Sequence, residues 1–256
     1  MRVYHEIHGP ADGEVVVLSG SIGSDLSMWD PQVEPLTSAG YRVVRHDHRG
    51  HGGSPVPDGP CSVADLGSDV VELLDELAVE SAHVVGLSLG GMIGMWLAIH
   101  HPERLGRLVL CCTSADLGTP ESWAERAAAA RTGGMTAIAD ASIQRWFTPR
   151  WRSAHPERTR EYHHMTASVP AQGYAACCAA IGSLDVREDL HRITAPTLVI
   201  AGADDPATPS DGHARPIAEA IPGARFEVVE GAAHLGTAEQ PERFSALILE
   251  HLKAGL

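Results

Sequence analysis

A serine in a glycine-framed turn is the first residue of this sequence whose setting points to chemistry. The pentapeptide GLSLG at residues 86–90 follows the apolar run His83–Leu87 and precedes a helical pattern. A sharp strand-to-helix turn strains its central residue, and the flanking glycines remove side chains that would collide across the turn. The Ser88 hydroxyl would then project above the sheet at a helix N-terminus, which favours a developing anion. We therefore predict Ser88 as a nucleophile, although a plain glycine-rich turn is the simpler alternative.

A serine hydroxyl becomes an effective nucleophile only when a base removes its proton. In a strand–turn–helix setting of this kind, the acid and then the histidine follow the serine along the chain. Two adjacent aspartates, Asp204 and Asp205, come just after the strand candidate Thr197–Ala201, and His234 comes after Phe226–Val229. The carboxyl ends of these strands share the sheet edge at which open α/β sheets bind ligands. We predict His234 as the general base and Asp205 as its acid, with Asp204 as a turn residue.

Two backbone N–H groups are needed to stabilise the oxyanion that forms when a serine attacks a carbonyl carbon. The residue after the nucleophile, Leu89, is one predicted donor. The second is Ile22, in the Gly/Ser-rich loop that follows the strand candidate Val15–Ser19, with assistance from Ser21. The alternative for that loop is an ordinary turn.

The elements that must hold these residues alternate between short apolar runs and helical patterns. Continuous Val/Ile/Leu runs are typical of strands buried on both faces of a parallel sheet. The strand candidates are Val3–His8, Val15–Ser19, Arg42–Asp47, His83–Leu87, Leu108–Cys112, Thr197–Ala201 and Phe226–Val229. The helix candidates between and after them are Val63–Ala78, Gly91–His100 and Phe244–Lys253. This alternation predicts an α/β fold.

Residues 115–189 interrupt the alternation. They contain Ala-rich helical pieces, Trp123–Arg131 and Met135–Phe147, and no clear strand pattern. We therefore predict two parts: a core formed by residues 1–114 and 190–256, and a helical cap, or lid, formed by residues 115–189.

The charge is strongly acidic, with 33 Asp and Glu against 19 Lys and Arg and a formal net charge of −14 over 256 residues. Such acidity argues against a nucleic-acid partner and against an anionic membrane surface. The cap range, however, holds eight of the basic and nine of the acidic residues. The acidity therefore belongs to the core, and a small anion would be held from the cap side.

The remaining features of the composition favour a cytoplasmic protein. The N-terminus lacks the apolar run of a signal peptide, and no apolar stretch approaches the roughly 20 residues that span a bilayer. The five cysteines show no C-x-x-C spacing that would indicate a zinc site.

The segment DHRGHGGS at residues 47–54 resembles the D-x-R-G-x-G-x-S signature of the α/β-hydrolase superfamily. A narrower resemblance, to the 3-oxoadipate enol-lactonases, covers nearly the whole chain. It is carried by SGSIG at 19–23 with MWD at 28–30, GLSLGGMIGMW at 86–96, LCCTS at 110–114, GGMTAIAD at 133–140, RWFT at 145–148, GYAACCA at 173–179 and AGADDPATP at 201–209. Three features depart from the family. Gly20 replaces the usual Asn of the oxyanion loop, and His234 is followed by Leu235-Gly236-Thr237, where relatives often carry a bulkier or Asn-containing stretch. The N-terminus is also one strand short of the eight-strand pattern.

The resemblance implies the α/β-hydrolase fold, a mostly parallel central sheet flanked by helices with a helical cap inserted after the sixth strand. It also implies a carboxylic ester hydrolase that converts 3-oxoadipate enol-lactone to 3-oxoadipate in the β-ketoadipate pathway of aromatic catabolism. Carried over position by position, Ser88, Asp205 and His234 would form the triad and an acyl-enzyme intermediate. No metal and no organic cofactor would be needed.

The implied substrate is a small anionic lactone whose acetate arm requires a cation or amide donors. A guanidinium matches a carboxylate with two parallel hydrogen bonds. Arginines in the cap are available at positions 126, 131, 145, 150 and 152. We predict Arg131 and Trp146 in the substrate shell, with Trp123 and Ser21 nearby. The alternative is that these arginines lie on solvated helix faces and that the tryptophans fill the core of the cap.

Other functions compete with this one. The same triad would serve a carboxylesterase, a perhydrolase or a C–C bond hydrolase. The histidines of HDHRGH at residues 46–51 suggest a metallo-lactonase, but that class needs Asp beside the last histidine, and here Asp47 lies between the first two. A non-catalytic binding protein on the same fold is the alternative from a different class.

Overall fold

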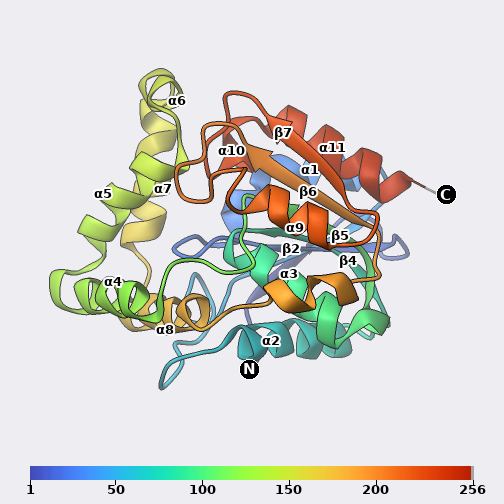
Figure 1. The fold of residues 1–256 in the computed structure, drawn as a ribbon, viewed down its shortest axis with the longest axis horizontal. Helices are drawn as coiled ribbons and strands as arrows, with labels where there is room; N and C mark the ends of the chain where they lie inside the picture. The colour runs from blue at the N-terminus through green and yellow to red at the C-terminus, as the bar shows by residue number, and fades with distance from the viewer. Residues whose placement is uncertain (255–256) are drawn as a thin grey trace.

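The computed structural model describes residues 1–254 and is built on one seven-stranded sheet between two layers of helices (Figure 1). The strands are β1 (His5–His8), β2 (Val15–Ser19), β3 (Arg42–His46), β4 (Ala82–Leu87), β5 (Leu105–Cys111), β6 (Thr197–Gly202) and β7 (Arg225–Val229). Their spatial order is β1-β3-β2-β4-β5-β6-β7; β1 is antiparallel to β3, and every other neighbouring pair is parallel. The α/β class predicted from the alternation is confirmed.

Side chains on the central strands alternate between the two faces of the sheet, as the two-residue period of a strand requires. On one face Val17 and Val84 pack with helices α2 (Val63–Glu76), α3 (Leu89–His100) and α9 (Ala214–Ala220). On the other face Val16, Leu18 and Val85 pack with α1 (Asp30–Ser38) and α11 (Pro241–Lys253). Because both faces are covered, these strands read in the sequence as unbroken apolar runs.

Every predicted strand is present, with shifts at the ends. The first strand begins at His5, two residues after the predicted Val3, and the fifth begins at Leu105, three residues before the predicted Leu108. The predicted helix Gly91–His100 begins earlier, at Leu89. The last two residues of the predicted core range, 255 and 256, lie outside the described residues.

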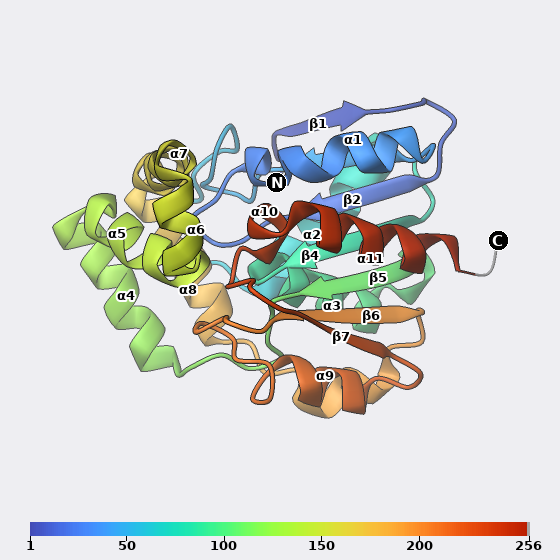
Figure 2. The same ribbon diagram turned by 90° about the horizontal axis from the view of Figure 1, so that it is seen from above.

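The predicted cap range contains five helices between β5 and β6, beyond the carboxyl ends of the parallel strands (Figure 2). They are α4 (Pro120–Gly133), α5 (Met135–Trp146), α6 (Pro149–Ala154), α7 (Pro156–Ala167) and α8 (Ala171–Gly182). The cap follows the fifth of the seven strands, not the sixth, because this sheet has one strand fewer than the eight-strand pattern. No helix among residues 1–254 is long and apolar enough to cross a membrane.

The two ends of the cap meet at one place, which we call the neck (residues 115–116 and 185–187). Asp116 and Asp185 form an isolated antiparallel β-bridge, and the Val186 N–H donates to the carbonyl oxygen of Ala115 at 3.0 Å. The Arg187 guanidinium contacts the carboxylate of Asp185 at 2.6 Å and that of Asp116 at 3.2 Å. The chain therefore leaves and re-enters the core side by side.

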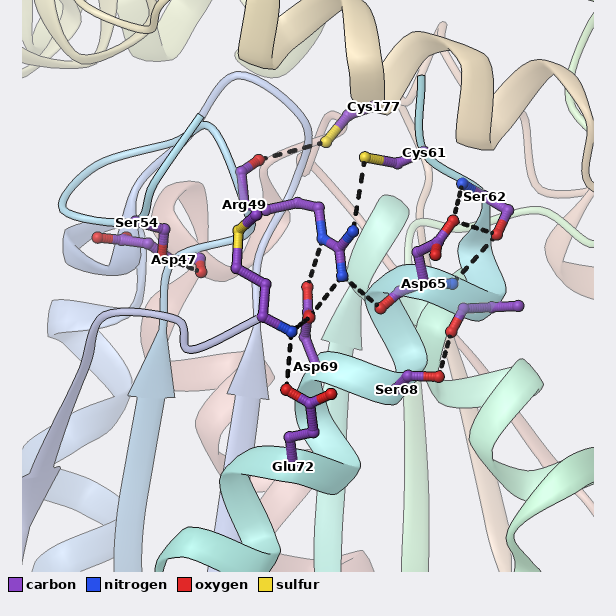
Figure 3. A network of polar contacts seen from close by, with 12 residues as sticks. Asp47, Arg49, Ser54, Cys61, Ser62, Asp65, Ser68, Asp69, Glu72 and Cys177 are labelled. Carbon is purple, nitrogen blue, oxygen red and sulfur yellow. Dashed lines mark hydrogen bonds and ion pairs between the residues drawn. The ribbon is translucent and has the colours of Figure 1, made fainter. Parts of the chain in front are cut away.

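A buried ion-pair network fixes the loop after β3 to helix α2 (Figure 3). The Asp69 carboxylate, whose side chain is 2% exposed, accepts from Arg49 Nε at 2.6 Å and from the N-terminal ammonium of Met1 at 2.6 Å. A charge out of contact with water is tolerated only when it is paired and hydrogen-bonded. The network therefore holds in place the loop that carries His48 and His51.

We expect Asp69→Asn to lower the free energy of unfolding by about 3–5 kcal/mol, because it leaves the Arg49 guanidinium, whose side chain is only 13% exposed, without its carboxylate partner. The matched control is Glu76→Gln, since Glu76 pairs with Arg2, whose side chain is 80% exposed. An exposed pair of this kind contributes about 0–1 kcal/mol. Urea unfolding of both variants measures the difference, and equal losses would contradict the role given to burial.

Candidate active site

Ser88 occupies the turn between β4 and α3 in a backbone conformation that few residues adopt. Its φ is 56° and its ψ is −114°, in the left-handed half of backbone space. A Cβ at Gly86 would lie 2.2 Å from the carbonyl oxygen of Gly90, and a Cβ at Gly90 would lie 2.0 Å from that of Ser19. Only glycine fits these two positions. The Thr113 hydroxyl donates to the Ser88 carbonyl at 2.7 Å and helps to hold the turn.

His234 and Asp205 form a buried pair at the carboxyl ends of β7 and β6. His234 Nδ1 lies 2.8 Å from Asp205 Oδ2, and both residues are 4% exposed. The other carboxylate oxygen accepts from the N–H groups of Ala207 and Thr208, at 2.8 and 3.1 Å, and the Thr208 hydroxyl donates to Oδ2 at 2.7 Å. The Asp205 carboxylate is thus oriented before it meets the imidazole.

Charge and hydrogen bonding keep Asp205 ionised despite its burial. Burial alone would raise the pKa of this carboxyl, but the charge of His234 and hydrogen bonds from His234 and Thr208 outweigh it and hold the pKa below its usual value. The neighbouring Asp204 is exposed, and its N–H donates to the carbonyl of Ala232. Of the two adjacent aspartates, Asp205 is the one that contacts the histidine.

The two predicted oxyanion donors, Ile22 and Leu89, lie in the loops that follow β2 and β4. Within residues 1–254, neither N–H donates a hydrogen bond to another backbone group. Ile22 lines the same cavity as Ser88, and Leu89 is the first residue of α3. Two unpaired N–H groups beside a serine hydroxyl are available to an incoming oxyanion.

Two buried histidines hold the loop that contains Ile22. His48 Nε2 donates to the Gly20 carbonyl at 2.9 Å, and the Gly23 N–H donates to His51 Nε2 at 3.0 Å. Burial lowers the pKa of His51 to about 3, so this ring stays neutral and its Nε2 stays an acceptor. Of the three HDHRGH histidines, His48 and His51 thus contact the loop backbone, and the His46 ring lies edge-on to His48 with 5.2 Å between the ring centres. The described residues contain no group of three His, Cys, Asp or Glu that could hold a metal ion.

Ser88 and His234 line a cavity of about 360 Å³ between the core and the cap. Three of the four predicted substrate-shell residues also line it: Ser21, Trp123 and Trp146. Both tryptophans are buried, at 8% and 4% exposure. The volume is within the range of small-molecule sites.

The fourth predicted shell residue, Arg131, is not among the residues that line this cavity. It is exposed in the last turn of α4, and its Nε donates to Gln172 Oε1 at 3.1 Å. The arginines that do line the cavity are Arg126 and Arg145. A helical-face argument could have found Arg126, because it follows Trp123 by three residues and so shares its face.

Arg126 and Arg145 bring two positive charges to one cavity. The Arg126 guanidinium lies 5.0 Å from the ring centre of Trp123 and 5.5 Å from that of Tyr174, which are cation–π distances. Burial and the positive charge of Arg126 lower the pKa of Arg145. A cavity lined by two guanidiniums suits an anion.

Comparison with known protein families shows the family to which this chain belongs. Residues 14–241 match the family model described as the alpha/beta hydrolase fold. The chain belongs to the α/β-hydrolase family. The match spans both strands and cap of this hydrolase, so it includes the segment in which Arg126 and Arg145 lie.

Individual relatives narrow the comparison. This hydrolase is 42% identical to 3-oxoadipate enol-lactonase 2 of Acinetobacter baylyi, over 93% of this chain and 88% of the relative. It is 36% identical to a putative carbamate hydrolase RutD of Caulobacter sp. (strain K31), over 98% and 95% of the two chains. The crystal structure of the enol-lactonase from Burkholderia xenovorans LB400 superposes with a TM-score of 0.95 at 39% identity, covering 98% and 96% of the chains.

Proposed function

We propose that this hydrolase opens 3-oxoadipate enol-lactone to 3-oxoadipate, with Ser88 as nucleophile, His234 as general base and Asp205 as the acid that orients it. The single observation that carries the proposal is the pair of cap arginines, Arg126 and Arg145, in the cavity of Ser88 and His234. An ester-hydrolysing site that also holds two guanidiniums suits an anionic ester. The similarity to enol-lactonases supports the same substrate.

The reaction would proceed through an acyl-enzyme. Ser88 Oγ attacks the ring carbonyl carbon while His234 takes its proton, and the N–H groups of Ile22 and Leu89 hold the oxyanion. Collapse breaks the ring C–O bond and releases an enolate, which takes the proton from His234 and tautomerises to the ketone. This step removes the tethered nucleophile that could re-close the ring. Water activated by His234 then hydrolyses the ester to Ser88.

The acetate arm of the lactone would lie against Arg126 and Arg145. Hydrogen bonds between a guanidinium and a carboxylate are charge-assisted, and burial strengthens them. The flat ring would be held beside Trp123 and Trp146. In this pose the charged end of the substrate is fixed by the cap and the reacting carbonyl by the core.

We expect Arg145→Met to raise KM for the enol-lactone by about 10- to 100-fold, since a hydrogen bond to a charged group contributes about 1.5–3 kcal/mol. Its kinetics with p-nitrophenyl acetate, which carries no anion, should change little. The control is Arg131→Met, because Arg131 is exposed on the same cap and should leave both KM values unchanged. An unchanged KM for the lactone in Arg145→Met would remove the carboxylate from this subsite.

Hydrolysis of a carbamate is a second candidate, favoured by the 36% identity with the putative carbamate hydrolase. The two substrates place charge differently. A carbamate anion carries its charge on oxygen atoms bonded to the carbon that must be attacked, whereas the enol-lactone separates its carboxylate from the reacting carbonyl. The arginine pair in the cap suits the second arrangement. Comparing kcat/KM for the lactone, neutral esters and carbamates would decide between them.

A further inference from the structure

We propose that Glu239 is a positioning residue that fastens the loop of His234 to the cap; the inference rests on the role proposed above for His234. Glu239 ends the short helix α10 (Gly236–Glu239) and is 6% exposed. Its Oε1 accepts from the N–H of Thr148 at 3.0 Å and from the Thr148 hydroxyl. Its Oε2 accepts from the N–H of Ala233 at 2.8 Å. One carboxylate thus joins a cap residue to the residue before His234.

Backbone contacts make the same connection a second time. The His234 N–H donates to the carbonyl of Arg145 at 3.4 Å, and the Leu235 N–H donates to that of Trp146 at 2.9 Å. Arg145 and Trp146 end helix α5, and their side chains line the cavity. The two residues that would contact the substrate therefore also carry the carbonyls on which the His234 loop rests.

The chemistry of this junction requires a carboxylate. Three donors converge on Glu239, namely two N–H groups and a hydroxyl, and a carboxylate can accept all of them. A glutamine of the same shape offers one oxygen and one NH₂, so its NH₂ would face either Thr148 or Ala233 as donor against donor. A buried polar group left unpaired in this way is costly, so the contact of residue 239 with either Thr148 or Ala233 would be lost.

Loss of one side would leave the His234 loop held to the cap only by the backbone hydrogen bonds to Arg145 and Trp146, so the loop would shift relative to the cap. The bond to Asp205 would still fix the tautomer of the ring, but not its distance from Ser88 and from a substrate held by the cap. A misplacement of about 1 Å can cost about 100-fold in rate. The expected defect is therefore in kcat rather than in substrate affinity.

The test is Glu239→Gln against Glu242→Gln, a substitution at an exposed glutamate in the first turn of α11. For Glu239→Gln we expect kcat for the lactone and for p-nitrophenyl acetate to fall about 10- to 100-fold, with KM within about twofold. The acid limb of the pH profile of kcat/KM should also move, and labelling of Ser88 by a fluorophosphonate should slow. Glu242→Gln should behave as the wild type in all four measurements.

The outcomes separate positioning from stability. If Glu239→Gln lowers the melting temperature but the folded enzyme keeps its kcat and its pH profile, Glu239 is merely structural and the proposal is wrong. If Glu239→Gln does not fold, Thr148→Val removes only the hydroxyl donor and should lower kcat less, in the same direction; an unchanged kcat would overturn the proposal. Failure of the proposed function is a separate result: the wild type would not open the lactone, or Ser88→Ala would keep full lactone hydrolysis.

Discussion

Replacing Ser88 with alanine is expected to reduce kcat for the enol-lactone by about 10⁶-fold, the size of effect that follows loss of a triad nucleophile. Without the hydroxyl, no acyl-enzyme can form, and only the oxyanion donors and substrate binding remain. The backbone turn should persist, because the glycines at 86 and 90 and the Thr113 hydroxyl that hold it are unchanged. The decay of enol-lactone absorbance measures the rate.

A second buried serine supplies the control. Ser114 lies just after β5 and its Oγ is 2.8 Å from His213 Nδ1, but it lines a separate cavity. Ser114→Ala should therefore keep kcat within a few-fold of wild type. Substantial lactone hydrolysis by Ser88→Ala would show that another group attacks the carbonyl. A fluorophosphonate that labels the wild type but not Ser88→Ala would also exclude a non-catalytic binding protein.

Asp205→Asn should reduce kcat by about 10⁴-fold, as expected when the acid of a triad becomes an amide. Asp205 Oδ2 accepts from His234 Nδ1, so the proton sits on Nδ1 and Nε2 is free to receive the serine proton. An amide NH₂ in that place would donate to Nδ1 and move the imidazole proton to Nε2. The histidine would then be the wrong tautomer to act as a base.

The neighbouring aspartate is the matched control for this variant. Asp204→Asn changes an exposed side chain and keeps the backbone hydrogen bond to Ala232, so kcat should stay near wild type.

The dependence of stability on pH gives an independent check on Asp205. Because the pKa of Asp205 is held below its usual value, its ionised form and the stability that it contributes are lost only as the pH falls through that lowered pKa. Equal losses of kcat in the two variants would contradict the assignment of the acid to Asp205.

The fold and the pairing of Asp205 with His234 were predictable because both depend on strand ends. Buried parallel strands read as unbroken apolar runs, and residues just after them collect at one edge of the sheet. The Ser88 turn was predictable for a further reason, since the close approaches at Gly86 and Gly90 exclude every side chain. These features are local in sequence and common to the fold.

The cap was harder to predict because its contacts are tertiary. Nothing local distinguishes the exposed Arg131 from Arg145, which is brought to the cavity by the packing of α5. Helices α6 and α7 begin at prolines and are largely polar, so their apolar periodicity is weak. The carboxylate of Glu239 reaches Thr148 across 91 residues of chain, and no spacing in the sequence indicates that pairing.

The neck has a consequence for how such an enzyme diversifies. Because residues 115–116 and 185–187 lie side by side in a β-bridge, the whole intervening segment can be exchanged at one junction without altering the spacing of the strands. Chain ends that lie close together are the arrangement in which insertion of a whole segment is tolerated. If the proposed function is right, a transplanted segment would bring its own cations and tryptophans to the cavity and with them a different substrate preference. It would also have to supply a hydrogen-bond donor for Glu239 in the place of Thr148. We expect an active chimera only from segments that meet this condition.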